Sequence, residues 1–174
     1  MNVIYATFIN NSVVHLFFLK EVFSMYSRLL VPLDGSSNSI EALKTAIRLA
    51  KDWHASLVLL HIDDITQVSS GGLGASYNEV VSAMRKASHQ ILTDAQAMAA
   101  DSDIPTTILQ SDGSPKQHIV EIANSPADAI DLIVIGKSGT NAFSRMVVGS
   151  TTNYVVQHAR PNVFVVNDSE SAKS

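Results

Sequence analysis

The feature that most limits the possible folds of this chain is a regular alternation of short apolar runs and amphipathic stretches. Continuous apolar runs, typical of strands buried on both faces, occur at residues 28–33, 56–62 and 131–136. A further apolar run at residues 161–166 is predicted to close the sheet as an exposed edge strand. A shorter and more polar run at residues 105–110 is predicted to be a strand at the edge of a sheet. Segments with helical spacing of apolar residues lie between these runs, at residues 38–53, about 77–101, from 115 onward and 150–158. The alternation predicts an α/β fold with a mainly parallel sheet that is covered on both faces.

Two of the predicted helices begin with recognisable capping residues. Asn38 and Glu41 have the spacing of a capping box, with Asn in place of the usual Ser or Thr. Ser114 is predicted to be an N-cap, with Pro115 at the first helical position, where the missing N–H costs no hydrogen bond.

The 174 residues are predicted to form one domain over residues 25–168, followed by a polar tail at 169–174. Met25 opens the first strand region, so residues 1–24 are interpreted as a dispensable extension or a start assigned too early. The alternative is an amphipathic helix that packs on the domain or lies on a surface. Polar residues interrupt this segment before ~20 apolar residues accumulate, so no membrane span is expected. It also lacks the basic start and the cleavage site of a signal peptide.

The charge balance and the absence of cysteine exclude several functions. The chain has 12 Lys and Arg residues, 16 Asp and Glu residues and no Cys. No basic stripe is visible, so nucleic acid is not an expected partner. Thiolate metal sites and cysteine nucleophiles are excluded, and the composition fits a cytoplasmic location. Because the motifs G-x-S-x-G and H-E-x-x-H are missing and the histidines lack ligand spacing, we predict neither a catalytic residue nor a metal site.

Three of the eight glycines lie in one segment, residues 131–155. In a doubly wound sheet, ligands bind beyond the carboxyl ends of the strands, where Asp34 and Gly136 are expected. Gly136 permits close approach of the backbone, and Gly139 permits a left-handed turn that directs N–H groups inward. Gly149 and Ser150 stand where the next helix begins, and helix N-termini favour phosphate. The segment therefore predicts a site for a phosphorylated ligand, with hydroxyl groups of the following residues as further donors.

The spacing of these glycines differs from the common phosphate loops. A Walker A loop needs a glycine at position 131, which is Asp131, and the dinucleotide fingerprint G-x-G-x-x-G also fails. The pattern that does match is G-x2-G-x9-G-[ST], formed by Gly136, Gly139, Gly149 and Ser150. It resembles the ATP-binding motif of the universal stress protein family. The resemblance covers residues 25–167 and includes the segments LLVPLDGS, LVLLHI, DGSPKQHIVEIA and ARPNVFVV.

This resemblance implies a five-stranded parallel sheet in the order 3-2-1-4-5, with helices on both faces, of the adenine-nucleotide alpha-hydrolase-like type. It implies that ATP, with Mg²⁺ carried by its phosphates, binds where the first and fourth strands meet. By position, Asp34 would lie near the ribose and Ile62 would meet the adenine through its backbone. The complete set of predicted binding residues is Pro32, Asp34, Ile62, Gly136, Gly139, Gly149, Ser150, Thr151 and Thr152. The resemblance further implies a homodimer that pairs through residues 161–166.

Some polar residues near the predicted site have two interpretations. Family members often carry His or Arg between the first two glycines, where this chain has Lys137 and Ser138. Lys137, like Arg145, either contacts phosphate or is a solvated surface charge. Asp63 and Asp64 are either solvated loop acids or neighbours of the Mg²⁺. His61 is interpreted as a structural histidine.

The leading functional hypothesis is an ATP-binding stress-response or signalling protein that senses nucleotide without turning it over rapidly. One alternative is a slow ATPase or a related nucleotide-transforming enzyme, because positioning and Mg²⁺ alone support phosphoryl transfer. No residue pair resembles a base poised beside a nucleophile, which argues against it. A second alternative is a dimeric interaction module with a vestigial pocket, against which the intact glycine spacing argues.

Overall fold

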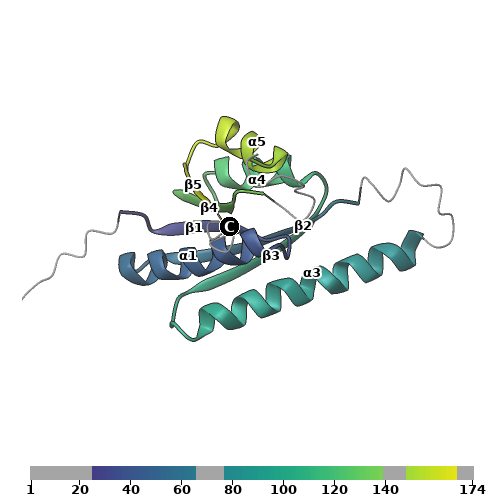
Figure 1. The fold of residues 1–174 in the computed structure, drawn as a ribbon, viewed down its shortest axis with the longest axis horizontal. Coiled ribbons are helices and arrows are strands. Elements are labelled where there is room, and N and C mark those ends of the chain that lie inside the picture. Colours follow the sequence, from purple (N-terminus) through teal and green to yellow (C-terminus); the bar gives the residue numbers. More distant parts are fainter. Residues whose placement is uncertain (1–24, 66–76, 139–147, 168–174) are drawn as a thin grey trace, which may run out of the picture.

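The computed structural model describes residues 25–65, 77–138 and 148–167 (Figure 1). Within these residues, five parallel strands form one sheet in the order β3-β2-β1-β4-β5. This confirms the predicted α/β class and the strand order 3-2-1-4-5. The strands are β1 (Arg28–Pro32), β2 (Ser56–Asp63), β3 (Thr106–Asp112), β4 (Leu132–Gly136) and β5 (Asn162–Val166). The helices are α1 (Ser37–Trp53), α3 (Tyr77–Ala100), α4 (Pro115–Asn124) and α5 (Ser150–His158).

The helices form two layers, with α1 and α3 on one face of the sheet and α4 and α5 on the other (Figure 1). The central strands lie between these layers, which is why their sequences are almost continuously apolar. All five residues of β4 are buried, as are Leu29, Leu30 and Val31 of β1. No residue of β3 is fully buried, in agreement with its predicted place at the edge of the sheet.

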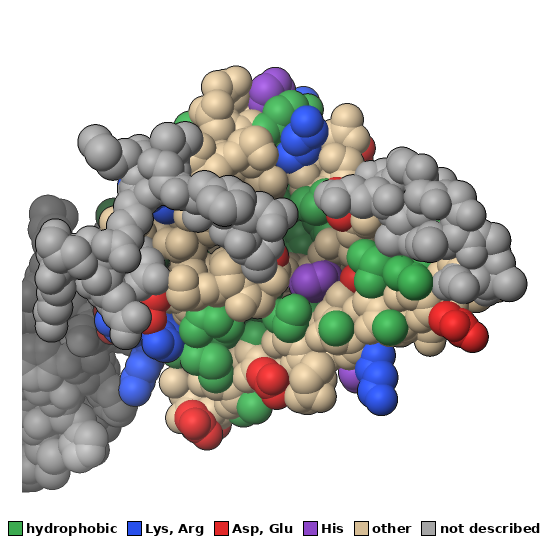
Figure 2. All heavy atoms as spheres, turned by 45° about the vertical axis from the view of Figure 1, so that its right-hand side comes forward, with side chains coloured by type: hydrophobic (Ala, Val, Ile, Leu, Met, Phe, Trp, Pro, Cys, Tyr) green, Lys and Arg blue, Asp and Glu red, His purple; other side chains and the backbone are tan. Residues whose placement is uncertain are grey.

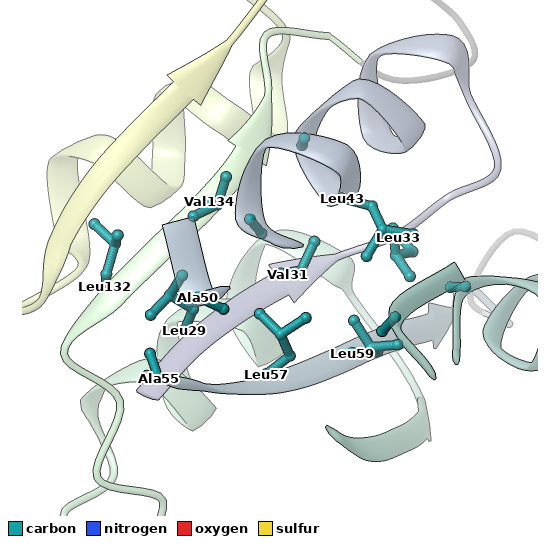
Figure 3. Close-up of a cluster of buried hydrophobic side chains, with 14 of the residues drawn as sticks. Leu29, Val31, Leu33, Leu43, Ala50, Ala55, Leu57, Leu59, Leu132 and Val134 are labelled. Carbon is teal, nitrogen blue, oxygen red and sulfur yellow. The ribbon is translucent and has the colours of Figure 1, made fainter. Parts of the chain in front are cut away.

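Each helix layer covers its own hydrophobic cluster. On the α1 side, side chains of β1, β2 and β4 gather beneath the helix (Figure 3). Ala42, Ala46 and Ala50 of α1 belong to this cluster, and their four-residue spacing places them on one helical face. These small side chains let α1 pack close to the sheet. The second cluster, on the α4 and α5 side, includes Leu60 and Ile135, whose strands end at the same edge.

Contacts that begin at residue 26 join the start of the domain to distant elements. The Asp131 carboxylate accepts hydrogen bonds from the Ser27 backbone N–H at 2.7 Å and from its hydroxyl at 2.6 Å. The ring of Tyr26 packs on Trp53 of α1, with 5.3 Å between ring centroids. The amide of Asn162 donates to the Tyr26 hydroxyl at 2.7 Å. The start of β1 is therefore fixed by β4, β5 and α1.

The predicted capping box of the first helix is wrong. The N-cap of α1 is Ser36, whose hydroxyl oxygen accepts a hydrogen bond from the Ser39 N–H at 3.2 Å. Asn38 lies inside the first turn, so its spacing from Glu41 has no capping role. The Asn38 amide instead donates to the Ser138 hydroxyl at 3.0 Å, across 100 residues of sequence. This bond links α1 to the segment that follows β4.

The other boundaries agree closely with prediction. α4 begins at Pro115 with Ser114 as its N-cap, as expected. Pro105 and Pro161 lie just outside β3 and β5, because proline has no N–H to donate to a strand ladder. Several predictions concern residues outside the described ranges, namely residues 1–24, Gly139, Arg145 and residues 169–174.

Candidate functional site

A cleft of about 630 Å³ lies at the carboxyl ends of the strands. This volume is in the usual range for a small-molecule site. The ends of β1, β2 and β4 form its floor, and the N-terminal turns of α1, α4 and α5 form its rim. The helix N-termini reach this edge because each helix follows the strand that precedes it in a parallel sheet.

The cleft brings together eight of the nine residues predicted from the sequence, and the ninth, Gly139, lies outside the described residues. The eight are Pro32, Asp34, Ile62, Gly136, Gly149, Ser150, Thr151 and Thr152. Asp34 and Gly149 are 115 positions apart in the chain, so only the parallel arrangement of β1 and β4 unites them.

The turn after β1 fixes the carboxylate of Asp34 at the mouth of the cleft. Its Oδ1 accepts hydrogen bonds from the Ser36 N–H at 3.0 Å and from the Ser36 hydroxyl at 2.6 Å. Gly35 has a φ of 78°, a left-handed conformation that favours glycine and turns the chain into α1. The exposed carboxylate accepts hydrogen bonds only, so it suits a ligand that presents hydroxyl groups.

The backbone of Ile62 faces the space left where β1 ends. The last residue pair between these strands is Pro32 with Leu60, and the Leu33 N–H donates to the Leu60 carbonyl at 2.8 Å. Backbone groups two residues apart on a strand point to the same side, so those of Ile62 point toward the cleft. They offer one donor and one acceptor to a ligand.

Gly136 is required by helix packing. A Cβ at this position would lie 2.7 Å from the backbone carbonyl carbon of Asn38 and 2.8 Å from its oxygen. The side of Gly136 on which a Cβ would project is therefore filled by the first turn of α1, while Gly136 itself still lines the cleft. Thr152, which is buried, donates its hydroxyl to the Gly136 carbonyl at 2.8 Å. Its hydroxyl hydrogen joins α5 to β4, so the donor that we predicted for phosphate is engaged within the protein.

The first turn of α5 offers backbone N–H groups to the cleft. Gly149 is the N-cap, and its carbonyl accepts the first helical hydrogen bond, from the Asn153 N–H at 2.9 Å. Helix geometry therefore leaves the N–H groups of residues 150–152 without an intrahelical acceptor. The Gly149 N–H donates to the Lys137 carbonyl at 2.9 Å, which holds the start of α5 against the end of β4. Such a helix start favours an anion.

Asp63 is neither a solvated loop acid nor a residue of the cleft, contrary to both interpretations given above. Its side chain is only 2% exposed and accepts hydrogen bonds from the Ser88 hydroxyl and from the Gln110 amide, the latter at 2.9 Å. It is thus a buried structural acid that joins β2 to α3 and β3. Asp64, in contrast, lines the cleft. His61 lies 3.7 Å from the Asp63 carboxylate, and its buried Nδ1 has no hydrogen-bond partner among the described residues.

Three polar lining residues escaped the sequence analysis as site residues, namely Ser39, Ser114 and Lys116. The last two begin α4, and the signal that could have found them is their place directly after a parallel strand. Their side of the cleft was not considered because the glycine motif contains no residue of α4.

The described residues carry no feature of a metal centre or of a membrane span. They contain no group of three or more His, Cys, Asp or Glu side chains that could hold a metal ion. None of their helices combines the length and apolar character that a bilayer requires. On the face drawn in Figure 2, Lys and Arg side chains occur at several places around the surface, some of them beside Asp and Glu side chains.

The parallel sheet, its strand order and the cleft between β1 and β4 define an α/β protein of the adenine-nucleotide alpha-hydrolase-like fold. The profile of the universal stress protein family matches residues 25–167. The chain therefore belongs to the universal stress protein family. It is 30% identical to the universal stress protein YxiE of Bacillus subtilis over 149 residues, which cover 82% of this chain and 99% of that protein.

Solved structures give the same result. The universal stress protein UspA from Lactobacillus plantarum is 33% identical and superposes with a TM-score of 0.74, over 81% of this chain and 97% of that one. More distant structures share the fold. One is a universal stress protein in complex with cAMP, with 22% identity, a TM-score of 0.59 and coverage of 83% and 98%. Another is the universal stress protein from Archaeoglobus fulgidus in complex with dAMP, with 18% identity, a TM-score of 0.57 and coverage of 81% and 98%.

Proposed function

We propose that this universal stress protein binds ATP, with Mg²⁺ carried by the phosphates, in the cleft between β1 and β4. The observation that carries the proposal is the convergence of Asp34, the Ile62 backbone and the first turn of α5 on one cleft. These groups supply an acceptor for hydroxyls, a donor and acceptor pair for a base, and N–H groups for phosphate. The adenine nucleotides bound by the cAMP and dAMP complexes support the same ligand class.

In this proposal each part of the nucleotide has its own contacts. The adenine lies against the apolar floor of Leu60 and Ile135 and meets the backbone of Ile62. The ribose hydroxyls donate to Asp34. The phosphates accept hydrogen bonds from the N–H groups at the start of α5, together with the segment that contains Gly139. Ser150 adds its hydroxyl as a side-chain donor.

We further propose that the protein senses the nucleotide and does not turn it over rapidly. Among the described residues that line the cleft, no hydrogen-bonded pair of side chains resembles a base beside a nucleophile. Binding without rapid chemistry suits a protein whose state follows nucleotide concentration. Incubation with ATP and Mg²⁺ and quantification of ADP tests this, and many turnovers per minute would contradict it.

We also propose that the protein acts in the cytoplasm as a homodimer that pairs through β5. In the described part of the sheet, β5 lies at the edge and pairs only with β4. Its outward residues Phe164 and Val165 are 47% and 39% exposed. Exposed strand edges tend to pair, and a two-fold axis would satisfy both copies at once.

Calorimetry with ATP, adenosine and Mg²⁺ tests the binding proposal. The parent protein should bind ATP at millimolar concentration or below, and absence of saturation would contradict the proposal. Gly149→Val should lose ATP binding, because a side chain would occupy the phosphate position. Its adenosine binding should remain, since adenosine has no phosphate.

The fold of the Gly149→Val variant provides the control. Gly149 has φ −60° and ψ 152°, a conformation open to every L-residue, so the variant should melt close to the parent. If it folds and still binds ATP like the parent, the placement of the phosphates at α5 is wrong.

A further inference from the structure

Lys116 carries a positive charge at a place where helix stability disfavours one. It is the second residue of α4, and the first turn of this helix has no acidic residue. The N-terminal end of a helix has a partial positive charge, so a cation there is repelled and an anion attracted. A residue that departs from a local rule of stability points to a role outside the helix itself.

The ammonium of Lys116 lies against the neighbouring helix α5. Its Nζ is 5.6 Å from the centroid of the Tyr154 ring, a distance typical of a cation–π contact. Tyr154 also stacks on His158, with 4.0 Å between centroids and 15° between planes, which holds the ring in place. Tyr154 stands one turn after Ser150, and helical side chains lean toward the N-terminus. The ammonium therefore lies beside the first turn of α5.

The charge of Lys116 is unusual within the cleft. Among the described residues that line it, Lys116 is the one cation, whereas Asp34 and Asp64 are acids. The ion pairs of the described side chains do not include Lys116. A cation without a carboxylate partner keeps its full attraction for a bound anion. It also offsets the repulsion that the two acids exert on phosphate.

We propose that Lys116 contacts the terminal phosphates of the nucleotide and makes the cleft prefer nucleoside polyphosphates to monophosphates. The inference rests on the proposed function, because it requires a nucleotide whose phosphates begin at α5. The first phosphate is held near the ribose and the start of α5. Each further phosphate adds negative charge and extends the chain, so a cationic contact from α4 favours the longer ligands.

Calorimetry of the full chain with ATP and with AMP tests this role. Lys116→Gln should raise the Kd for ATP about tenfold, the usual effect of losing one charge-assisted hydrogen bond. The Kd for AMP should rise less than the Kd for ATP, since AMP carries less negative charge and lacks the terminal phosphates that Lys116 is proposed to contact. Lys116→Arg, which keeps the charge, should restore most of the affinity for ATP.

Two controls separate a contact from a general effect of charge or folding. Lys51→Gln removes the same charge from the last turn of α1, at the end of the helix that lies away from the cleft, and should leave both Kd values unchanged. Without ligand, Lys116→Gln should melt within about 2 °C of the parent. Removing the unfavourable positive charge from the N-terminus of α4 offsets the loss of the contact with the Tyr154 ring. Tyr154→Leu should weaken ATP binding about two- to fivefold, and Tyr154→Phe should not.

The outcomes distinguish this inference from the function on which it rests. Parent protein that binds neither ATP nor AMP would reject both. Parent protein that binds ATP, together with Lys116→Gln that binds it equally well, would reject only the role of Lys116. An equal loss of ATP and AMP affinity in Lys116→Gln would likewise overturn the preference for polyphosphates.

Discussion

Replacing Gly136 by alanine should destabilise the fold through a clash with the backbone of α1. The added Cβ would lie 2.7 Å from the Asn38 carbonyl carbon, 2.8 Å from its oxygen and 2.9 Å from its Cβ. Real Cβ atoms essentially never approach so closely. Two of these neighbours are backbone atoms, which cannot rotate away as the end of a flexible side chain can. Relief requires the first turn of α1 to move away from β4.

The size of the effect follows from how overpacked cores behave. Extra methyl groups in a well-packed interior typically cost about 1–3 kcal/mol, and a clash with backbone belongs in the upper half of that range. A loss of about 2–3 kcal/mol in the free energy of unfolding lowers the melting temperature of a domain of this size by about 4–12 °C. The displaced helix also carries the Asn38 bond to Ser138, so that link should weaken as well.

Thermal unfolding followed by circular dichroism, without nucleotide, measures this effect. Gly149→Ala is the matched control, because Gly149 has an ordinary φ of −60°. Its melting temperature should stay near that of the parent or rise slightly, since alanine restricts the unfolded chain. If Gly136→Ala melted like Gly149→Ala, α1 would not be packed against β4 as described.

Three further predictions concern the buried acid, the start of the domain and the sheet edge. Ser88→Ala should cost about 1–3 kcal/mol in urea unfolding, because buried Asp63 loses a donor; the exposed Ser82→Ala should cost much less, and equal losses would contradict the role of Ser88. A chain that starts at Met25 should melt within a few degrees of the full chain, and aggregation of the shorter chain alone would show that residues 1–24 pack on the domain. Light scattering should give a mass well above the 18.7 kDa of one chain, and Val165→Asp should reduce it to that value; a parent protein that is already monomeric would refute pairing through β5.

The sequence alone was sufficient for the class of fold because local patterns decide it. The apolar runs at β1, β2 and β4 predicted central strands, and the more polar run at β3 predicted an edge, as the structure has them. The start of α4 was predicted because Ser114 and Pro115 act within one turn of chain. The strand order came from the resemblance to the family, since periodicity says nothing about which strands are neighbours.

Errors arose where two local signals competed. Asn38 and Glu41 had the right spacing for a capping box, but Ser36 caps α1 two residues earlier. Ser36 prevails because the left-handed turn at Gly35 places its hydroxyl over the Ser39 N–H. Spacing alone does not reveal where a turn directs the chain.

The sequence by itself determined the helices and strands of this protein and pointed to the glycines that line its cleft, because propensity and periodicity act over a few residues. Only the tertiary structure decided what these residues touch. Asn38 packs against Gly136, and Ser88 and Gln110 donate hydrogen bonds to the Asp63 carboxylate. The ammonium of Lys116 lies over the ring of Tyr154. The members of each of these pairs are at least 25 positions apart. Such contacts depend on how crossovers bring strand ends and helix starts to one edge of the sheet, which no local pattern encodes.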